Sequence, residues 1–352
     1  MKLLNILITS AGGNGAGNQI AKSLRLIKNG RYNLFYADNN PDNIQFRDES
    51  ILELPLVSDE NYDEKIVSFV EENKINAIVP GSDKELYHFA TRKEFFEKKQ
   101  IFIPINNIKT IGLCLDKSLL NEKLIELNYL PPKSIKFTFN KELPDIDWYP
   151  VVLKPSDGGG GSANVFIAQD KIELNNLLMY LNQAYKNESF FLQEYVGTFD
   201  SEYTVGILHD HDGSFVDSIA MKRDLTQSIS VRSSVKNNTK KFDLGKQLVI
   251  SSGVSQGVIG KFEDITLQCR DIAESIGSTG PLNIQCRFER GKVRVFEINP
   301  RFSGTSFFRS LVGFNEVDLL LRKHLLNEDI NRDTSWDDFI AIRSLEETIF
   351  KK

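Results

Sequence analysis

The chain has 352 residues, enough for two or three domains with sizeable hydrophobic cores. Its net charge of −5 supplies no overall basic field, which argues against nucleic acid or an anionic membrane as a partner. The apolar run near the start is too short to span a membrane, and the three widely spaced cysteines show no metal-type pairing. We therefore expect a cytoplasmic protein in a reducing environment.

The first hundred residues alternate between apolar strands and amphipathic helices. Such alternation implies a parallel sheet with helices on both faces. We predict a Rossmann-like α/β domain of this kind over residues 1–113. Its predicted strands are 3–9, 34–37, 77–79 and 101–103, and its predicted helices are 18–29, 62–73 and 83–98.

A glycine-rich loop at 11–18 follows the first predicted strand and opens a helix. It suggests a dinucleotide fingerprint, with Asp38 about where the ribose acid would be. The spacing does not fit, because the third glycine of G-x-G-x-x-G, counted from Gly13, falls on Asn18. The pattern favours a helix N-terminus that holds a carboxylate or a phosphate.

The pattern changes near Cys114 to an α+β arrangement with mostly antiparallel strands. Asp116 is a suitable N-cap for a helix at 117–127, which Pro131 and Pro132 end. We predict two lobes, at 114–195 and 196–330, and a tail at 331–352. The later predicted strands are 151–154, 190–194, 202–208, 215–221, 283–288 and 293–299, with a short one within 337–344, and the later helices are 171–184, 264–276 and 316–326.

The segment from His209 to Gly213 has two interpretations. Its two histidines and two aspartates could form a metal tract, whereas Asp212-Gly213 between two strands is a strong hairpin signal. We predict the hairpin.

Lys154 ends a buried-looking strand and precedes four consecutive glycines, Gly158, Gly159, Gly160 and Gly161. Glycines let the backbone approach an anion closely and present amides to it. An ammonium on the adjoining strand can hold a phosphate at a fixed point. The alternative is a flexible hairpin connection beside an ordinary edge lysine.

The segment 191–197 is a strand that runs into a glycine, with Glu202 soon afterwards. Its backbone could pair with an adenine edge while a carboxylate takes ribose hydroxyls. By itself, a plain connector between domains is the simpler explanation.

The strand that begins at Val293 ends in Glu297, Asn299 and Arg301, each two residues from the last. Side chains on a strand alternate faces, so these three are expected on one side. Carboxylate and amide oxygens suit Mg²⁺, and a guanidinium takes phosphate oxygens bidentately. A strand that simply enters a polar loop is the alternative.

The preceding strand carries Gln285, and its position depends on the turn between the strands. A two-residue turn at 290–291 would place Gln285 and Glu297 on opposite faces, whereas a three-residue loop, or a glycine bulge, would place them opposite each other. We predict the three-residue loop, with Gln285, Glu297 and Asn299 in one site.

Two arginines follow the predicted strand 215–221 in a polar stretch. Arg223 and Arg232 could hold an anionic substrate beside a magnesium site, although each arginine by itself is more often a surface charge.

Taken in order, these motifs resemble the ATP-grasp superfamily, and within it the branch similar to the large subunit of carbamoyl phosphate synthetase. The resemblance extends to about residue 326, and Ser10-Ala11-Gly12-Gly13 resembles the preATP-grasp domain that usually precedes such modules. The matching motifs are Asp116-Lys117, Val152-Leu153-Lys154-Pro155, Gln193-Glu194-Tyr195-Val196, Asn283-Ile284-Gln285 and Glu297-Ile298-Asn299-Pro300-Arg301.

The resemblance implies that ATP, with Mg²⁺ or Mn²⁺, binds between two α+β lobes. The implied nucleotide contacts are Lys117, Lys154, Glu194, Val196 and the loop 158–161, to which the residue-level interpretation above adds Glu202. The implied metal ligands are Gln285, Glu297 and Asn299, where many relatives carry an acid in place of Gln285. The resemblance implies that Arg301 steadies the transferred phosphoryl group, and we add Lys154 and Arg223 as further candidate catalytic residues.

The activity implied by the resemblance is an ATP-dependent ligase that joins a small-molecule carboxylate to an amine through an acyl phosphate. A kinase at the same site, a nucleotide-binding module without catalysis, and an NAD-dependent enzyme that uses the loop 12–17 remain as alternatives. The chain is far shorter than a full synthetase subunit, so synthesis of carbamoyl phosphate from glutamine is not expected. The sequence leaves the substrates unidentified and a homodimer open.

Overall fold

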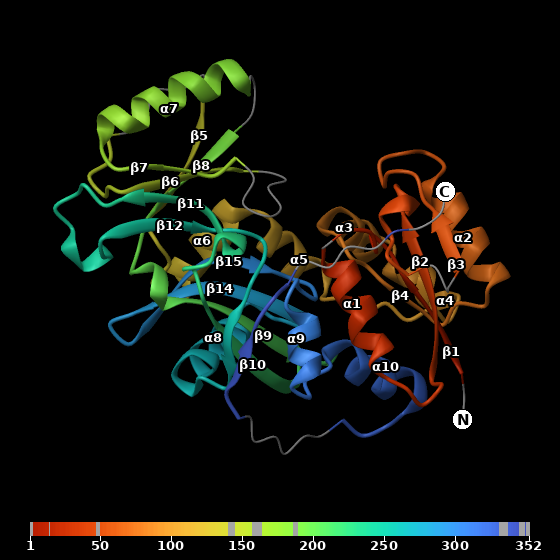
Figure 1. The fold of residues 1–352 in the computed structure, drawn as a ribbon. Coiled ribbons are helices and arrows are strands. Elements are labelled where there is room, and N and C mark those ends of the chain that lie inside the picture. The colour runs from red at the N-terminus through yellow and green to blue at the C-terminus, as the bar shows by residue number, and fades with distance from the viewer. Residues whose placement is uncertain are drawn as a thin grey trace.

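The structure is a computed structural model that describes residues 3–13, 15–46, 50–139, 145–156, 164–185, 189–330, 337–344 and 349. An N-terminal domain lies beside a two-lobed body, and helices α1 (Ala16–Arg25), α9 (Ser306–Leu311) and α10 (Glu316–Leu326) lie between them (Figure 1). The glycine loop 158–161 lies outside the described residues.

The N-terminal domain contains a parallel sheet in the order β3-β2-β1-β4, which confirms the predicted α/β class. Its central strands are apolar and buried, as expected for a sheet covered on both faces. The strands are β1 (Leu4–Ile8), β2 (Tyr32–Asp38), β3 (Ser50–Glu53) and β4 (Ala77–Val79), and the remaining helices are α2 (Tyr62–Glu72), α3 (Asp83–Thr91), α4 (Lys93–Lys98) and α5 (Ile108–Leu115).

Two predictions for this domain are wrong in detail. The predicted helix 83–98 is interrupted at Arg92, whose backbone (φ −113°, ψ 11°) leaves the helical region. The predicted strand 101–103 forms only a single parallel bridge, between Phe102 and Ala77. The predicted boundary after residue 113 falls inside α5, and the division into domains stays a prediction.

The central lobe is a four-stranded antiparallel sheet in the order β5-β8-β6-β7, with α7 (Lys171–Ala184) packed on one face. Asp116 caps α6 (Lys117–Glu126) as predicted, since its carboxylate accepts the amides of Ser118 and Leu119 at 2.8 and 3.0 Å. The strands are β5 (Ser134–Thr138), β6 (Val151–Pro155), β7 (Phe166–Ala168) and β8 (Ser189–Glu194).

The C-terminal lobe is a six-stranded antiparallel sheet in the order β15-β14-β9-β10-β13-β16, and α8 (Glu263–Ser275) covers one face. The short strand predicted in the tail is present as β16 (Phe339–Ala341). The other strands are β9 (Glu202–His209), β10 (Phe215–Arg223), β13 (Gly257–Gly260), β14 (Pro281–Glu289) and β15 (Lys292–Asn299), and a separate antiparallel pair is formed by β11 (Val231–Lys236) and β12 (Gln247–Ser251). Four 3₁₀ turns in the described residues are Pro41–Asn43, Phe199–Ser201, Ser228–Ser230 and Phe242–Leu244.

The hairpin predicted at 209–213 is confirmed. It joins β9 to β10 antiparallel, and the Asp210 amide donates to the Ser214 carbonyl at 2.8 Å. Asp210 accepts from Lys323 and contacts the His324 ring nitrogen, so its carboxylate fixes the turn to α10.

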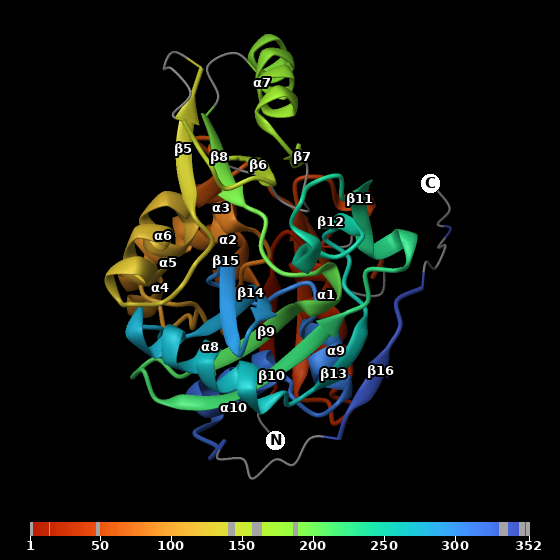
Figure 2. The same ribbon diagram turned by 90° about the vertical axis from the view of Figure 1, so that its left-hand side faces the viewer.

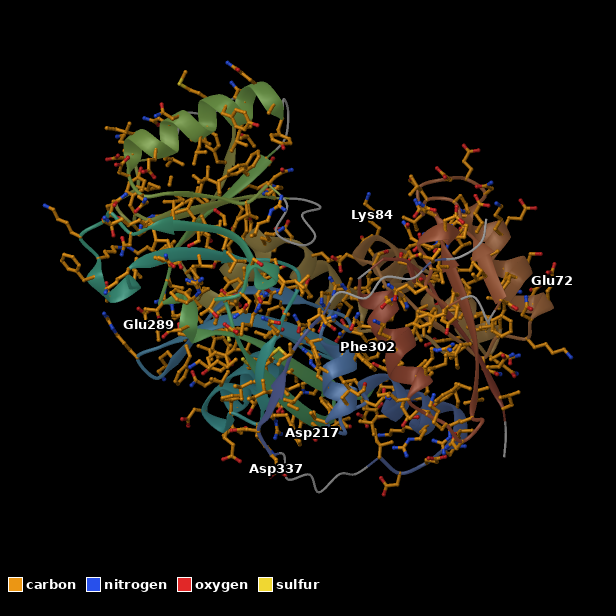
Figure 3. All side chains as sticks on the ribbon, in the orientation of Figure 1. Glu72, Lys84, Asp217, Glu289, Phe302 and Asp337 are labelled. Carbon is orange, nitrogen blue, oxygen red and sulfur yellow. The ribbon has the colours of Figure 1, made fainter. Side chains whose placement is uncertain are left out.

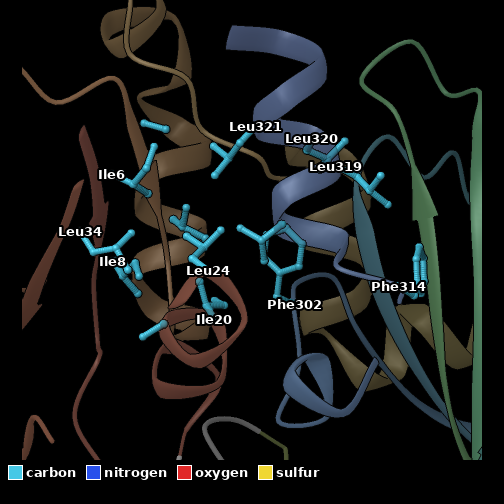
Figure 4. Close-up of a cluster of buried hydrophobic side chains, with 14 of the residues drawn as sticks. Ile6, Ile8, Ile20, Leu24, Leu34, Phe302, Phe314, Leu319, Leu320 and Leu321 are labelled. Atoms are coloured by element: carbon cyan, nitrogen blue, oxygen red, sulfur yellow. The ribbon is translucent and has the colours of Figure 1, made fainter. Parts of the chain in front are cut away.

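One hydrophobic cluster joins the N-terminal domain to the C-terminal lobe. Phe302 lies at their junction (Figure 3), and in Figure 4 its ring lies between apolar side chains of α1 and of α10. Because the cluster is continuous, the loops of the N-terminal domain are fixed relative to the large sheet. In the part of the chain that the structure describes, no helix is long and apolar enough to cross a membrane.

We expect His209 to make the protein less stable in acid. Its ring is fully buried without a hydrogen bond among the described residues, and burial lowers its pKa to about 4, with Glu274 and Arg270 the nearest charges. The unfolded state therefore binds the proton first, and stability should fall by roughly 1–3 kcal/mol as pH drops from about 6.5 to 4.

The variant His209→Phe tests this expectation. It keeps an aromatic ring against Phe215 and should show a flatter dependence of the urea midpoint on pH between 6.5 and 4. An equally steep dependence in the variant would show that other groups cause the acid sensitivity.

Candidate functional site

A cavity of about 780 Å³ brings the predicted site together. Its walls come from the central lobe, the six-stranded sheet, the β11–β12 pair and two loops of the N-terminal domain, and Figure 2 shows the central sheet standing above the larger one. Every predicted site residue that the structure describes lines this cavity. They are Lys117, Lys154, Glu194, Val196, Glu202, Arg223, Gln285, Glu297, Asn299 and Arg301.

The predicted three-residue loop between β14 and β15 is wrong. The turn has two residues, Arg290 and Gly291, with φ values of 51° and 77° that suit the tight turn of a twisted hairpin. Such a turn would place Gln285 and Glu297 on opposite faces, but the register shifts between Gln285 and Cys286. One extra residue, Phe296, forms a bulge and restores Gln285 opposite Glu297.

The bulge also supports Lys154. The Lys154 ammonium donates to the Phe296 carbonyl at 3.1 Å and to Gln193 Oε1 at 2.9 Å. Burial lowers the pKa of Lys154 to about 8, while nearby Glu297 raises it and Lys117 lowers it further. Lys154 is therefore held by neutral oxygens, and its charge is available to an anion.

The cavity-facing side of the large sheet follows simple strand alternation. Asn283, Gln285 and Arg287 of β14 line the cavity, whereas Leu282, Ile284 and Cys286 belong to the core under α8. The same rule places Glu297 and Asn299 of β15 on the cavity side beyond the bulge.

The donor set of Gln285, Glu297 and Asn299 fits Mg²⁺. It offers one carboxylate and two amide oxygens, the hard ligands that this ion takes together with water and phosphate oxygens. Among the described residues no cluster of three or more His, Cys, Asp or Glu forms an alternative metal site.

Arg301 lies against the N-terminal domain. Its Nε donates to Asp83 Oδ1 at 2.6 Å, its Nη1 to the Phe302 carbonyl at 3.0 Å and its Nη2 to Asn299 Oδ1 at 3.4 Å. Asp83 is the first residue of α3, so the domain that precedes the two lobes supplies a side chain to the site.

Glu202 lies in a buried ion-pair network. It is 2% exposed, and its carboxylate accepts from Arg223 Nη1 at 3.1 Å and from Arg287 Nη2 at 3.0 Å. A ribose hydroxyl at Glu202 would share oxygens that already have these partners. The predicted ribose contact stays a prediction, and the structure gives Glu202 a positioning role.

The remaining predicted nucleotide contacts lie near the start of α6 and between the two lobes. Lys117 donates to the Ser156 carbonyl at 3.1 Å. Glu194 Oε2 accepts the Lys133 amide at 3.3 Å and lies 3.5 Å from Arg294 Nη2. Val196 is buried, and its carbonyl accepts from Arg287 at 3.2 Å.

Sequence reasoning missed two residues of the site. Arg287 follows Gln285 by two positions, so the alternation that placed Gln285 could also have placed Arg287 on the cavity face. Asp83 is different, because nothing local relates it to Arg301, which is 218 positions away.

A cavity lined by lysines, metal-type oxygens and an arginine lies between two antiparallel lobes and beside a parallel-sheet domain, which is the arrangement expected from the resemblance to ATP-grasp proteins. Residues 186–348 match the family described as "ATP-grasp in the biosynthetic pathway with Ter operon", and residues 6–104 match the "PylC-like, N-terminal domain". The predicted superfamily is confirmed by these matches. The narrower resemblance to carbamoyl phosphate synthetase is not tested by them and stays a prediction.

Solved structures with the same fold include several ligases. An L-amino acid ligase from Bacillus licheniformis has a TM-score of 0.62 at 16% identity, over 92% of this chain and 75% of that one. A D-alanine–D-alanine ligase from Bacillus anthracis, complexed with ATP, has a TM-score of 0.57 at 14% identity, over 93% and 98%. An N5-carboxyaminoimidazole ribonucleotide synthetase from Thermotoga maritima has a TM-score of 0.55 at 15% identity, over 92% and 76%.

No curated protein matches the chain in sequence. The likeness to the solved structures concerns the fold, and together with the family matches it supports the predicted enzyme class, an ATP-grasp ligase.

Glu297→Ala should weaken Mg²⁺–ATP binding by more than tenfold, about 1.4 kcal/mol, because Glu297 is the only full negative charge in the proposed ligand set. Asn299→Ala should cause a smaller loss, since an amide oxygen carries only a partial charge. Calorimetry of Mg²⁺–ATP with both folded variants measures this order. Unchanged affinity in Glu297→Ala would remove Glu297 from the metal site.

Lys154 should make nucleotide affinity depend on pH. With a pKa of about 8 the ammonium loses its proton between pH 7.5 and 9, so the Kd for Mg²⁺–ATP should rise by up to about tenfold over that range. Lys154→Met should bind more weakly at pH 7.5 and show a flatter profile. A steep profile retained in Lys154→Met would assign the pH dependence to another group.

Proposed function

We propose that the protein is a Mg²⁺- and ATP-dependent carboxylate–amine ligase that acts through an acyl phosphate. The observation that carries the proposal is the convergence, in one cavity, of Lys117, Lys154, Glu297, Asn299 and Arg301. These residues supply what phosphoryl transfer requires of a protein, namely positioned reactants and stabilisation of developing negative charge.

Each group has a distinct part in this reaction. Lys154 and Lys117 bind phosphate oxygens of ATP, and Gln285, Glu297 and Asn299 hold the magnesium. The bound Mg²⁺ neutralises charge on the phosphate oxygens. The substrate carboxylate attacks the γ-phosphorus, ADP leaves, and the amine then displaces phosphate from the acyl phosphate to form the amide. The protein need supply no covalent nucleophile, so its contribution is orientation and electrostatics.

The position of Arg301 favours a role in the transfer step. Its planar guanidinium lies beside the proposed metal ligand Asn299. There it can hydrogen-bond to the phosphoryl group while that group passes from the ADP oxygen to the carboxylate oxygen of the substrate. Asp83 fixes one edge of the guanidinium and leaves it pre-oriented.

Screening carboxylate and amine libraries for ADP release tests the activity. A ligase releases ADP only when both substrates are present, and Glu297→Ala serves as the inactive control. ADP release with one substrate alone and a phosphorylated product would establish a kinase instead. Binding of NAD(H) without binding of ATP would contradict both.

Arg301→Lys should impair turnover more than ATP binding. Lysine keeps the charge but loses the bidentate fork, so kcat and kcat/KM should fall together while the KM for ATP changes little. Steady-state kinetics with the identified substrates measures this. A raised KM with an unchanged kcat would make Arg301 a nucleotide-positioning residue.

A further inference from the structure

The β11–β12 pair carries a bulge at the cavity. Val231 pairs with Ser251 and Ser233 pairs with Ile250, so Arg232 is an extra residue on β11. Bulges re-aim a side chain, and Arg232 lines the cavity. The cavity therefore receives a guanidinium from the strand pair that lies outside both large sheets.

Arg232 differs from most other cations of the cavity in its charge environment. Arg223 and Arg287 share Glu202, Arg301 pairs with Asp83, and Lys154 is near Glu297. In the described ranges, only Lys117 and Arg232 among the cavity-lining cations have no acidic neighbour of this kind. The cationic side chains that line the cavity are Lys117, Lys154, Arg223, Arg232, Arg287 and Arg301.

Two serines lie at the end of β12 and in the loop that follows it. Ser251 and Ser255 line the same cavity and are each 8% exposed. Their hydroxyls have no hydrogen-bond partner among the described residues, and Ser251 is adjacent to the bulge through its pairing with Val231. Neither hydroxyl oxygen is fully buried, so both are open to the cavity and can hydrogen-bond to a polar ligand group there.

We propose that Arg232, with Ser251 and Ser255, binds a second anionic group of the carboxylate substrate. The substrate is then a small molecule with a reacting carboxylate and a further carboxylate or phosphate. This inference rests on the proposed ligase function, in which Lys117, Lys154 and the metal already take the charge of ATP. A guanidinium, with hydroxyls lining the same cavity, can hydrogen-bond to the planar or tetrahedral oxygens of either anion.

The proposal is tested by binding, without turnover. Glutarate carries two carboxylates, 3-phosphoglycerate carries a carboxylate and a phosphate, and butyrate is the monocarboxylate control. Calorimetry is performed with saturating Mg²⁺ and a non-hydrolysable ATP analogue. The wild-type protein should bind at least one dianion tenfold or more tightly than butyrate, and the preferred probe distinguishes a carboxylate from a phosphate.

Arg232→Gln should abolish this preference while the affinity for the Mg²⁺–nucleotide stays the same, and Arg232→Lys should retain part of it. Lys246→Gln is the matched control, since Lys246 is an exposed cation in the connection between β11 and β12 and does not line the cavity. Arg232 is itself exposed, so its replacement is not expected to unfold the chain.

Three outcomes would overturn the proposal. They are equal binding of dianions and butyrate by the wild-type protein, an unchanged preference in Arg232→Gln, and a loss of nucleotide affinity in Arg232→Gln, which would assign Arg232 to ATP. Failure of the wild-type protein to bind the Mg²⁺–nucleotide would instead defeat the ligase function, and this is measured first.

Discussion

The cavity depends on one buried carboxylate. Glu202 lies between Arg223 and Arg287, and without it two guanidinium groups would share one sheet face with no ion-pair partner. The two guanidinium groups also donate hydrogen bonds to backbone carbonyls in the connection between the lobes, in β12 and in the loop after β12. The carbonyl groups that accept from these arginines belong to Val196, Gly197, Val249, Ser252 and Val254.

This network leaves a surplus of positive charge beneath the cavity. Because three charges are fixed by mutual hydrogen bonds, the surrounding backbone does not need to rearrange when an anion enters. The Lys154 ammonium is also fixed before an anion binds. It donates to the Phe296 carbonyl in the bulge and to the amide oxygen of Gln193, and neither oxygen carries a charge that would neutralise it. The site is thus prepared for negatively charged reactants before they bind.

The parts of the site that were predictable are those governed by strand periodicity and helix capping. Alternation alone placed Glu297 and Asn299 together, and a single side-chain oxygen at Asp116 determined where α6 begins. The turn at Arg290 was not predictable, because the sequence is compatible with a two-residue turn and with a three-residue loop. The two-residue turn requires the bulge at Phe296, and a contact with Lys154 from another lobe stabilises that bulge. The partner of Arg301 depends on the packing of two domains, which no local pattern encodes.

The bulge at Phe296 has a consequence for how this chain can vary over time. In a regular ladder, each residue added or lost between the turn and Glu297 would exchange the core and cavity sides of everything that follows it on β15, but the bulge takes up one such residue. Deletion of Phe296 would leave a regular ladder in which Val295 stays in the core and Glu297 still pairs with Gln285 on the cavity side, but the Phe296 carbonyl that accepts from Lys154 would be lost. A change of one residue in this stretch is therefore compatible with the site when the bulge takes it up.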